Sequence, residues 1–328
     1  MDRLIVKNFG PLKDIDIKLN KINLFIGENG SGKSVLGKLV TILKDPMSNI
    51  NTFKNYNIDY LNNDTYIKYT ANDKSYFKEF DGFSHSTNSV TLGSDSSSQY
   101  IPAERNLISL FNKYVTTFIT ADIPLPKFLL NFSSQYVRAR EEIRELDLLN
   151  VKYKFQSDQE RIFYSDKEYL LLEQSSSGIQ SALPLYLTVK YFAKKHKSII
   201  IEEPEQNLFP KAQTETIQYI IEQVSSTNNL FLMTHSPYVL SALNTLMMAY
   251  KAGNLGEEAN KEVSKLFKEE QWINPSDFSA YYLENGIARD IKGRTGLISE
   301  NEIDDISDEM ACDFEDLLEL YSEYSDDK

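Results

Sequence analysis

The stretch GENGSGKS, residues 27–34, constrains the fold of this chain more than any other feature. It matches the pattern G-x-x-x-x-G-K-[ST], with an apolar, strand-like run before it and a helix-like run, Lys33–Leu43, overlapping its end. Glycines at these spacings let backbone N–H groups point inward around an anion, and a helix start adds partial positive charge. The stretch therefore predicts an α/β fold with a phosphate-binding loop at the end of a strand.

Every residue of this loop, called the P-loop below, is a candidate nucleotide contact. Lys33 would reach the β- and γ-phosphates of ATP, and the Ser34 hydroxyl would bind Mg²⁺, a hard cation that prefers oxygen ligands. ATP and Mg²⁺ are therefore the expected cofactors. The loop consists of Gly27, Glu28, Asn29, Gly30, Ser31, Gly32, Lys33 and Ser34.

A second signal is the stretch SIIIEEPEQNLFP, residues 198–210. Its isoleucines predict a buried parallel strand, and ligands of open α/β sheets bind where such strands end. Glu202 and Glu203 stand at that end, and adjacent strand residues point to opposite sides. We therefore expect separate roles: Glu202 in the Mg²⁺ shell, and Glu203 as the base that orients and deprotonates the attacking water.

Two further stretches supply candidates at the ends of other strands. In THSPYVL, residues 234–240, His235 follows a strand-like run and would donate a hydrogen bond to the γ-phosphate. In QYIPAER, residues 99–105, Gln99 is a candidate contact to Mg²⁺ and water. For Gln99 an alternative serves equally well, in which the stretch is simply a strand end that enters a helix.

The stretch QSSSGIQS, residues 174–181, has the composition of a flexible linker but lies between two apolar runs. A serine hydroxyl and glycine N–H groups at a helix start would form a second anion site. Both interpretations stay open on the residues alone.

The order of these motifs resembles the ABC-type ATPase head, and more closely the bacterial branch related to SMC, Rad50, RecF and the overcoming-lysogenisation-defect proteins. In that family the serine–glycine element is a signature motif, Leu-Ser-Gly-Gly-Gln. Ser177, Gly178 and Gln180 match it, whereas Ser176 and Ile179 depart from it. The resemblance implies a homodimer closed around ATP, in which this signature element completes the γ-phosphate site of the second chain. Residues 204–208 occupy the family's D-loop position at that interface.

The resemblance implies a single ABC-type domain over residues 1–328, with a β-rich N-terminal subdomain. Between the P-loop and the signature element the sequence has no heptad run, so no long coiled coil is expected. The pattern at residues 104–150 predicts a compact helical lobe inserted into the domain.

The net charge of −13 is concentrated in residues 299–328, which hold 13 acidic residues and one lysine. The apolar spacing of Phe314, Leu317, Leu318 and Tyr321 predicts an acidic amphipathic helix that docks on the body or on a partner. An acidic segment cannot bind nucleic acid phosphates, and the rest of the chain is nearly neutral. Binding of nucleic acid is therefore possible but unsupported by charge.

The single cysteine, Cys312, excludes an internal disulfide, and no apolar run approaches ~20 residues. We therefore expect a cytoplasmic protein without a membrane span. The function expected is an ATPase that hydrolyses ATP, dimerises on it and controls an effector protein; stand-alone heads of this kind resemble ATPase components of anti-phage defence modules. One alternative is a RecF-like DNA-binding repair ATPase. Another is a nucleotide-bound scaffold with negligible turnover.

Overall fold

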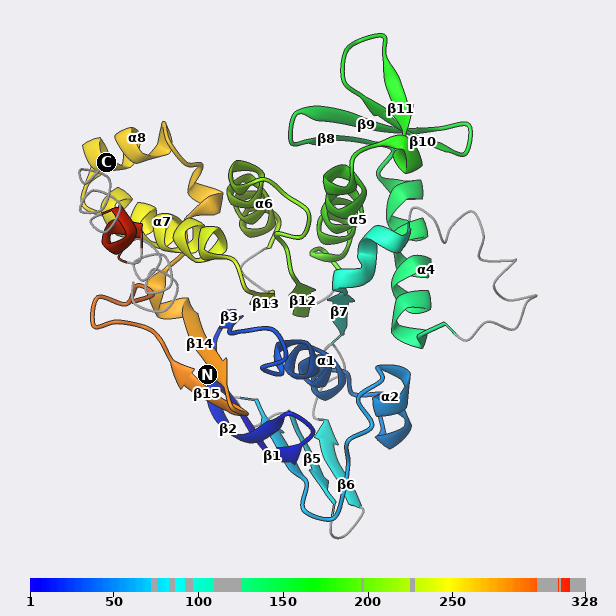
Figure 1. The fold of residues 1–328 in the computed structure, drawn as a ribbon, viewed down its shortest axis with the longest axis vertical. Coiled ribbons are helices and arrows are strands. Elements are labelled where there is room, and N and C mark those ends of the chain that lie inside the picture. The colour runs from blue at the N-terminus through cyan, green and yellow to red at the C-terminus, as the bar shows by residue number, and fades with distance from the viewer. Residues whose placement is uncertain are drawn as a thin grey trace, which may run out of the picture.

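The computed structural model describes residues 1–71, 76–82, 86–91, 97–108, 125–195, 198–224, 228–299, 312 and 314–318. Within these residues eleven strands form one mixed sheet, which confirms the predicted α/β fold (Figure 1). In spatial order the strands are β6 (Ser86–Thr91), β5 (Tyr76–Asp81), β4 (Tyr66–Thr70), β1 (Asp2–Phe9), β2 (Leu12–Leu19), β15 (Ile287–Asp290), β14 (Phe278–Glu284), β3 (Ile22–Ile26), β13 (Asn229–Thr234), β12 (Ser198–Glu202) and β7 (Ser98–Ile101).

The sheet has two parts with different pairing. From β6 through β5, β4 and β1 to β2 all neighbours are antiparallel, which gives the N-terminal part its β-rich character. From β14 through β3, β13 and β12 to β7 all neighbours are parallel. The hairpin of β14 and β15 connects the two parts, because β15 lies beside β2.

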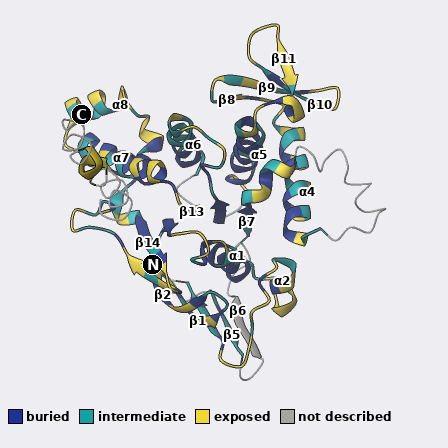
Figure 2. Ribbon diagram, viewed as in Figure 1, coloured by how far each residue is buried: buried dark blue, intermediate teal, exposed yellow. Residues whose placement is uncertain are grey.

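Helices cover both faces of the parallel part. Helix α1 lies on one side, and α5, α6 and α7 lie on the other (Figure 1). Every residue of β3 and β12 is buried, as expected for parallel strands that are covered on both faces (Figure 2). The helices are α1 (Lys33–Lys44), α2 (Ile50–Asn55), α4 (Lys127–Glu142), α5 (Ser177–Phe192), α6 (Pro210–Gln223), α7 (Pro237–Gly253) and α8 (Glu257–Ser264).

The segment predicted as a helical lobe is only partly helical. Helix α4 accounts for its middle, and residues 109–124 lie outside the described part of the chain. Its end is not helical, because Glu145–Leu148 forms strand β8 with both leucines buried and both acidic residues exposed. That alternation has the period of a strand, and β8 joins a separate antiparallel sheet. The other strands of this sheet are β9 (Val151–Gln156), β10 (Gln159–Phe163) and β11 (Tyr169–Leu171).

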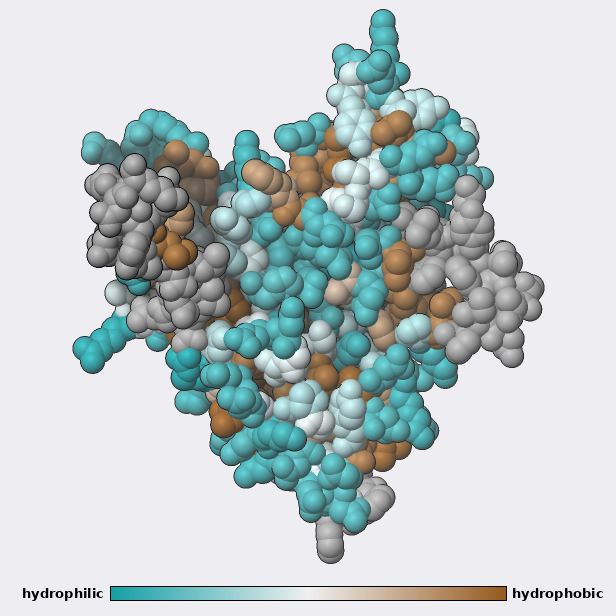
Figure 3. Space-filling model, viewed as in Figure 1, coloured by the Kyte–Doolittle hydropathy of each residue, from teal (hydrophilic) through white to brown (hydrophobic). Residues whose placement is uncertain are grey.

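The start of the acidic C-terminal segment is only partly described. Phe314, Leu317 and Leu318 are exposed, whereas Tyr321 lies outside the described residues. The docking role of this segment therefore stays a prediction. On the face seen in Figure 3 hydrophilic side chains predominate, and hydrophobic ones gather in small areas such as that along α4. Among the described residues, no helix is both long enough and apolar enough to cross a membrane.

Candidate nucleotide-binding site

The P-loop connects the end of β3 to the start of α1, as the sequence predicts. Gly30 and Gly32 adopt φ angles of 83° and 102°, which L side chains rarely reach. A Cβ atom at Gly32 would also lie 2.8 Å from Leu12 Cδ2. The glycines of the motif are therefore required by the path of the backbone into the helix.

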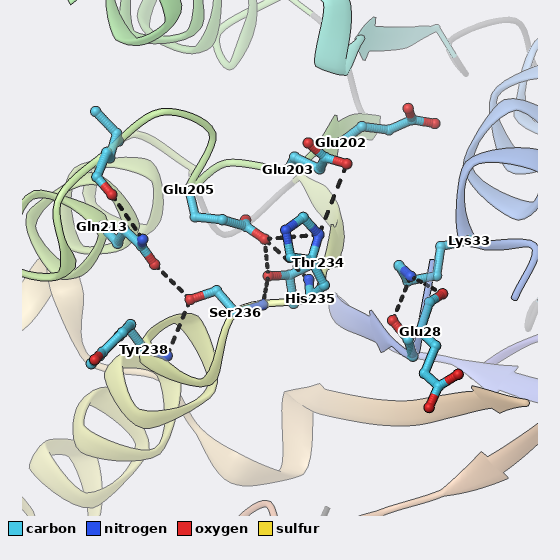
Figure 4. Close-up of polar contacts among 12 residues, drawn as sticks. Glu28, Lys33, Glu202, Glu203, Glu205, Gln213, Thr234, His235, Ser236 and Tyr238 are labelled. Carbon is cyan, nitrogen blue, oxygen red and sulfur yellow. Dashed lines mark hydrogen bonds and ion pairs between the residues drawn. The ribbon is translucent and has the colours of Figure 1, made fainter. Parts of the chain in front are cut away.

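Lys33 is folded back onto its own loop (Figure 4). Its Nζ donates hydrogen bonds to Gly27 O at 2.5 Å and to Glu28 O at 2.8 Å. Burial lowers the pKa of Lys33, and the nearby carboxylates of Glu203 and Glu205 partly oppose this shift. The ammonium group is thus held at the loop by weak neutral acceptors, which a phosphate could replace with charged ones.

Glu202 is buried at the end of β12, with 3% of its surface exposed. Burial raises the pKa of its carboxyl to about 7, and hydrogen bonds from Tyr100 and Ser34 act in the opposite direction. Its Oε1 atom is buried and has no hydrogen-bond partner in the described part of the chain. A carboxyl oxygen without a partner, next to the Ser34 hydroxyl, is a donor set that fits Mg²⁺.

Glu203 takes the opposite side from Glu202, as expected for adjacent residues. Its φ angle is +44°, and its N–H donates to Met233 O at 2.8 Å. The carboxylate is partly exposed, and its Oε1 lies 3.9 Å from His235 Nδ1 (Figure 4). The predicted base therefore stands at the open side of the strand end, beside the predicted histidine.

The backbone register explains why these residues meet. Ile26 pairs with Thr234, and Met233 pairs with Glu202, across three adjacent parallel strands. The P-loop, the two glutamates and His235 therefore begin at the same level of the sheet edge. The structure brings together all of these predicted residues.

Glu205 is a site residue to which the sequence gave no role. Its carboxylate is buried, and its Oε1 accepts hydrogen bonds from Thr234 Oγ1 at 2.6 Å and from His235 N at 3.0 Å. The same atom lies 3.8 Å from His235 Nδ1. Glu205 therefore anchors the turn that carries His235. The available signal was a third carboxylate directly after a buried strand.

We expect Glu205→Ala to lower the free energy of unfolding by about 2 kcal/mol, because hydrogen bonds to a carboxylate are lost and the buried Thr234 hydroxyl loses its acceptor. Urea denaturation measures this change. Glu205→Gln keeps an acceptor oxygen and should retain most of the stability, and Glu258→Ala on the exposed side of α8 is the neutral control. An alanine variant as stable as the wild type would refute the anchoring role.

The signature element is a helix start and not a linker. Ser176 is the N-cap of α5, and its side chain accepts a hydrogen bond from Ile179 N. Ser177 is exposed at the first helical position. A Cβ atom at Gly178 would lie 2.9 Å from Asn207 O, so only glycine lets the helix pack this closely on the D-loop segment, residues 204–208.

Gln180, the third residue that matches the signature motif, serves the same helix start. Its Nε2 atom donates to Ser175 O at 2.9 Å and to Glu173 O at 3.3 Å. The side chain therefore fixes the turn that leads into α5. A role for Gln180 at the nucleotide of another chain stays a prediction.

Gln99 does not join the cluster, so its predicted place as a Mg²⁺ contact is not supported. It pairs with Ile199, three residues before Glu202, which corresponds to about 10 Å along a strand. Its buried amide donates to Gln135 Oε1 at 2.6 Å and to Tyr100 O at 3.0 Å. The prediction failed because the motif fixes the strand but not the register. The next residue, Tyr100, is the one that reaches Glu202.

Comparisons with known proteins agree with this arrangement. Residues 131–240, from α4 to the histidine turn, match the family model of an AAA ATPase domain. Over 265 residues the chain is 23% identical to the "Probable ABC transporter ATP-binding protein p29" of Mesomycoplasma hyorhinis, which covers 80% of this chain and 88% of that protein. These matches confirm the resemblance to the ABC-type ATPases.

Two solved structures illustrate the similarity. The recombination mediator protein RecF is 10% identical with a TM-score of 0.47, over 88% of this chain and 97% of that chain. The SMC head domain from Thermotoga maritima is 12% identical with a TM-score of 0.44, over the same shares of the two chains.

Proposed function

We propose that this chain binds ATP with Mg²⁺ and hydrolyses it, at a site completed by a second copy of the chain, and that ATP-driven pairing controls a partner protein. One observation carries the proposal. At a single edge of the sheet, three adjacent parallel strands end in the P-loop, in Glu202 and Glu203, and in His235. That edge is where open α/β sheets bind ligands.

Glu203 is the general base of the proposed reaction. Its carboxylate is accessible and lies near His235, so a water molecule can reach it from the open side. Glu203 takes a proton from this water, whose oxygen bonds to the γ-phosphorus while the bond to the β-phosphate oxygen breaks and its electron pair leaves with ADP. Phosphoryl transfer needs mainly positioning and charge stabilisation, which the surrounding groups supply.

Lys33 and Ser34 bind the nucleotide in this proposal. The Lys33 ammonium exchanges the carbonyls of Gly27 and Glu28 for phosphate oxygens. Mg²⁺ held by Ser34 and Glu202 would neutralise charge on those oxygens. His235 is partly exposed and is anchored by Glu205, so it is placed to donate a hydrogen bond to the γ-phosphate.

The second copy enters through the signature element. Ser177 is exposed at the start of α5, where helix N–H groups and a hydroxyl favour an anion. The ABC-type resemblance supports the proposal that this anion is the γ-phosphate bound by another chain. For the partner protein, the exposed apolar residues Phe314, Leu317 and Leu318 within an acidic segment offer a surface suited to a basic groove.

Lys33→Ala tests nucleotide binding at this site. We expect at least a tenfold loss of affinity, because the one cation of the P-loop is removed. Binding of a fluorescent ATP analogue with Mg²⁺ and steady-state phosphate release would both be measured, with the exposed Lys211→Ala as control. Wild-type binding and turnover in Lys33→Ala would contradict the proposal. Binding by the wild-type chain without turnover would instead favour the scaffold alternative.

A further inference from the structure

A buried arginine lies behind the candidate site. Arg105 belongs to the short 3-10 turn Ala103–Leu107, which follows β7, and it is fully buried. Burial lowers the pKa of its guanidinium to about 10, so the group still carries its charge at neutral pH. A buried charge is costly unless its donors are paired, so the partners of this group matter.

The partners of Arg105 are backbone carbonyls from three separate segments. One is its own turn, where Nη1 donates to Pro102 O at 3.1 Å. The second is α5, where Nε donates to Ser181 O at 3.1 Å. The third is the end of β12, where Nη1 donates to Glu202 O at 2.7 Å and Nη2 to Glu203 O at 2.5 Å. The planar guanidinium thus spans all three segments at once.

Two other contacts bind the same segments together. Ser181 Oγ donates to Gln206 Oε1 at 3.1 Å, and Gly178 packs against Asn207 O. Helix α5, the D-loop segment and the end of β12 therefore form one connected unit around Arg105. The unit includes the peptide of Glu203, whose φ of +44° needs support from its surroundings.

We infer that Arg105 is a positioning residue for Glu203 and that it couples the signature helix α5 to the end of β12. The inference rests on the proposed function. In a dimer with shared sites, Ser177 of one chain would serve the nucleotide of its partner, whereas Glu203 serves the nucleotide of its own chain. Arg105 joins the two elements within one chain, so closure at one site is transmitted to the base of the other.

Arg105→Lys tests this inference because lysine keeps the charge but cannot reach carbonyls of three segments. We expect kcat to fall about 10²-fold, as for a small misplacement of a catalytic group, while ATP affinity stays within about threefold of the wild type. Arg138→Lys, on the exposed side of α4, is the matched control. Equal losses of affinity and turnover would indicate a merely structural role and overturn the inference, as would wild-type kcat.

A second measurement does not depend on turnover. Hydrogen–deuterium exchange should become faster in Arg105→Lys in peptides covering residues 177–185 and 202–208 together, with no change in α1. Faster exchange in only one of these regions, or in none, would overturn the coupling. If the wild-type chain releases no phosphate, the proposed function fails, and the exchange data alone decide the role of Arg105 in joining α5 to β12.

Discussion

Glu203→Gln is expected to bind ATP with an affinity close to that of the wild-type chain and to lose about 10²–10⁴-fold in turnover. Glutamine has nearly the same shape and keeps the backbone bond from residue 203 to Met233 O. It cannot accept the proton of the attacking water. Because Glu202 and Ser34 are unchanged, the Mg²⁺ ligands remain in place.

Steady-state phosphate release and binding of a fluorescent ATP analogue measure the two properties separately. Size-exclusion chromatography with ATP should show the variant as a dimer, since the nucleotide is no longer consumed. Glu258→Gln, exposed on α8, controls for the loss of one negative charge. A Glu203→Gln chain that hydrolyses ATP at nearly the wild-type rate would remove Glu203 from the mechanism.

Ser177→Arg should abolish turnover while a single chain still binds ATP. Ser177 is exposed at the start of α5, and Lys33 and Ser34 are untouched by the change. A bulky cation at this position would occupy the space into which the γ-phosphate of another chain must enter. The large effect is therefore expected only if the site is shared between chains.

The same pair of assays, affinity and phosphate release, checks this variant. Ser134→Arg, on the exposed side of α4, introduces the same side chain elsewhere and should have little effect. Mixing Ser177→Arg with Lys33→Ala should restore part of the activity, because one of the two mixed sites is then intact. Purified Ser177→Arg with wild-type turnover would show that the signature element plays no part in catalysis.

The P-loop and the buried strands could be predicted from the sequence because their signals are local. The glycine spacing fixes a backbone path, and a run such as Ser198–Ile201 can only be buried. The order of parallel strand ends then brings Glu202, Glu203 and His235 together. These parts of the site depend on pattern and on general sheet geometry.

The remaining parts depend on contacts between residues far apart in sequence. Arg105 bonds to Glu202 O and Glu203 O across almost a hundred positions, and nothing in the stretch PAER distinguishes a buried arginine from an exposed one. Gln99 was misplaced because a motif does not set the register of β7 against β12. Strand β8 was taken for helix because a four-residue alternation at the end of a helical pattern is a weak signal.

The central claim is that the active site is shared between two chains, and the dependence of specific activity on chain concentration tests it most directly. Phosphate release per chain would be measured at saturating ATP and Mg²⁺ over a wide dilution series, with analytical ultracentrifugation on the same samples. The account predicts that activity per chain falls on dilution in parallel with the fraction of dimer. Full activity per chain in samples that sediment as monomers would contradict it.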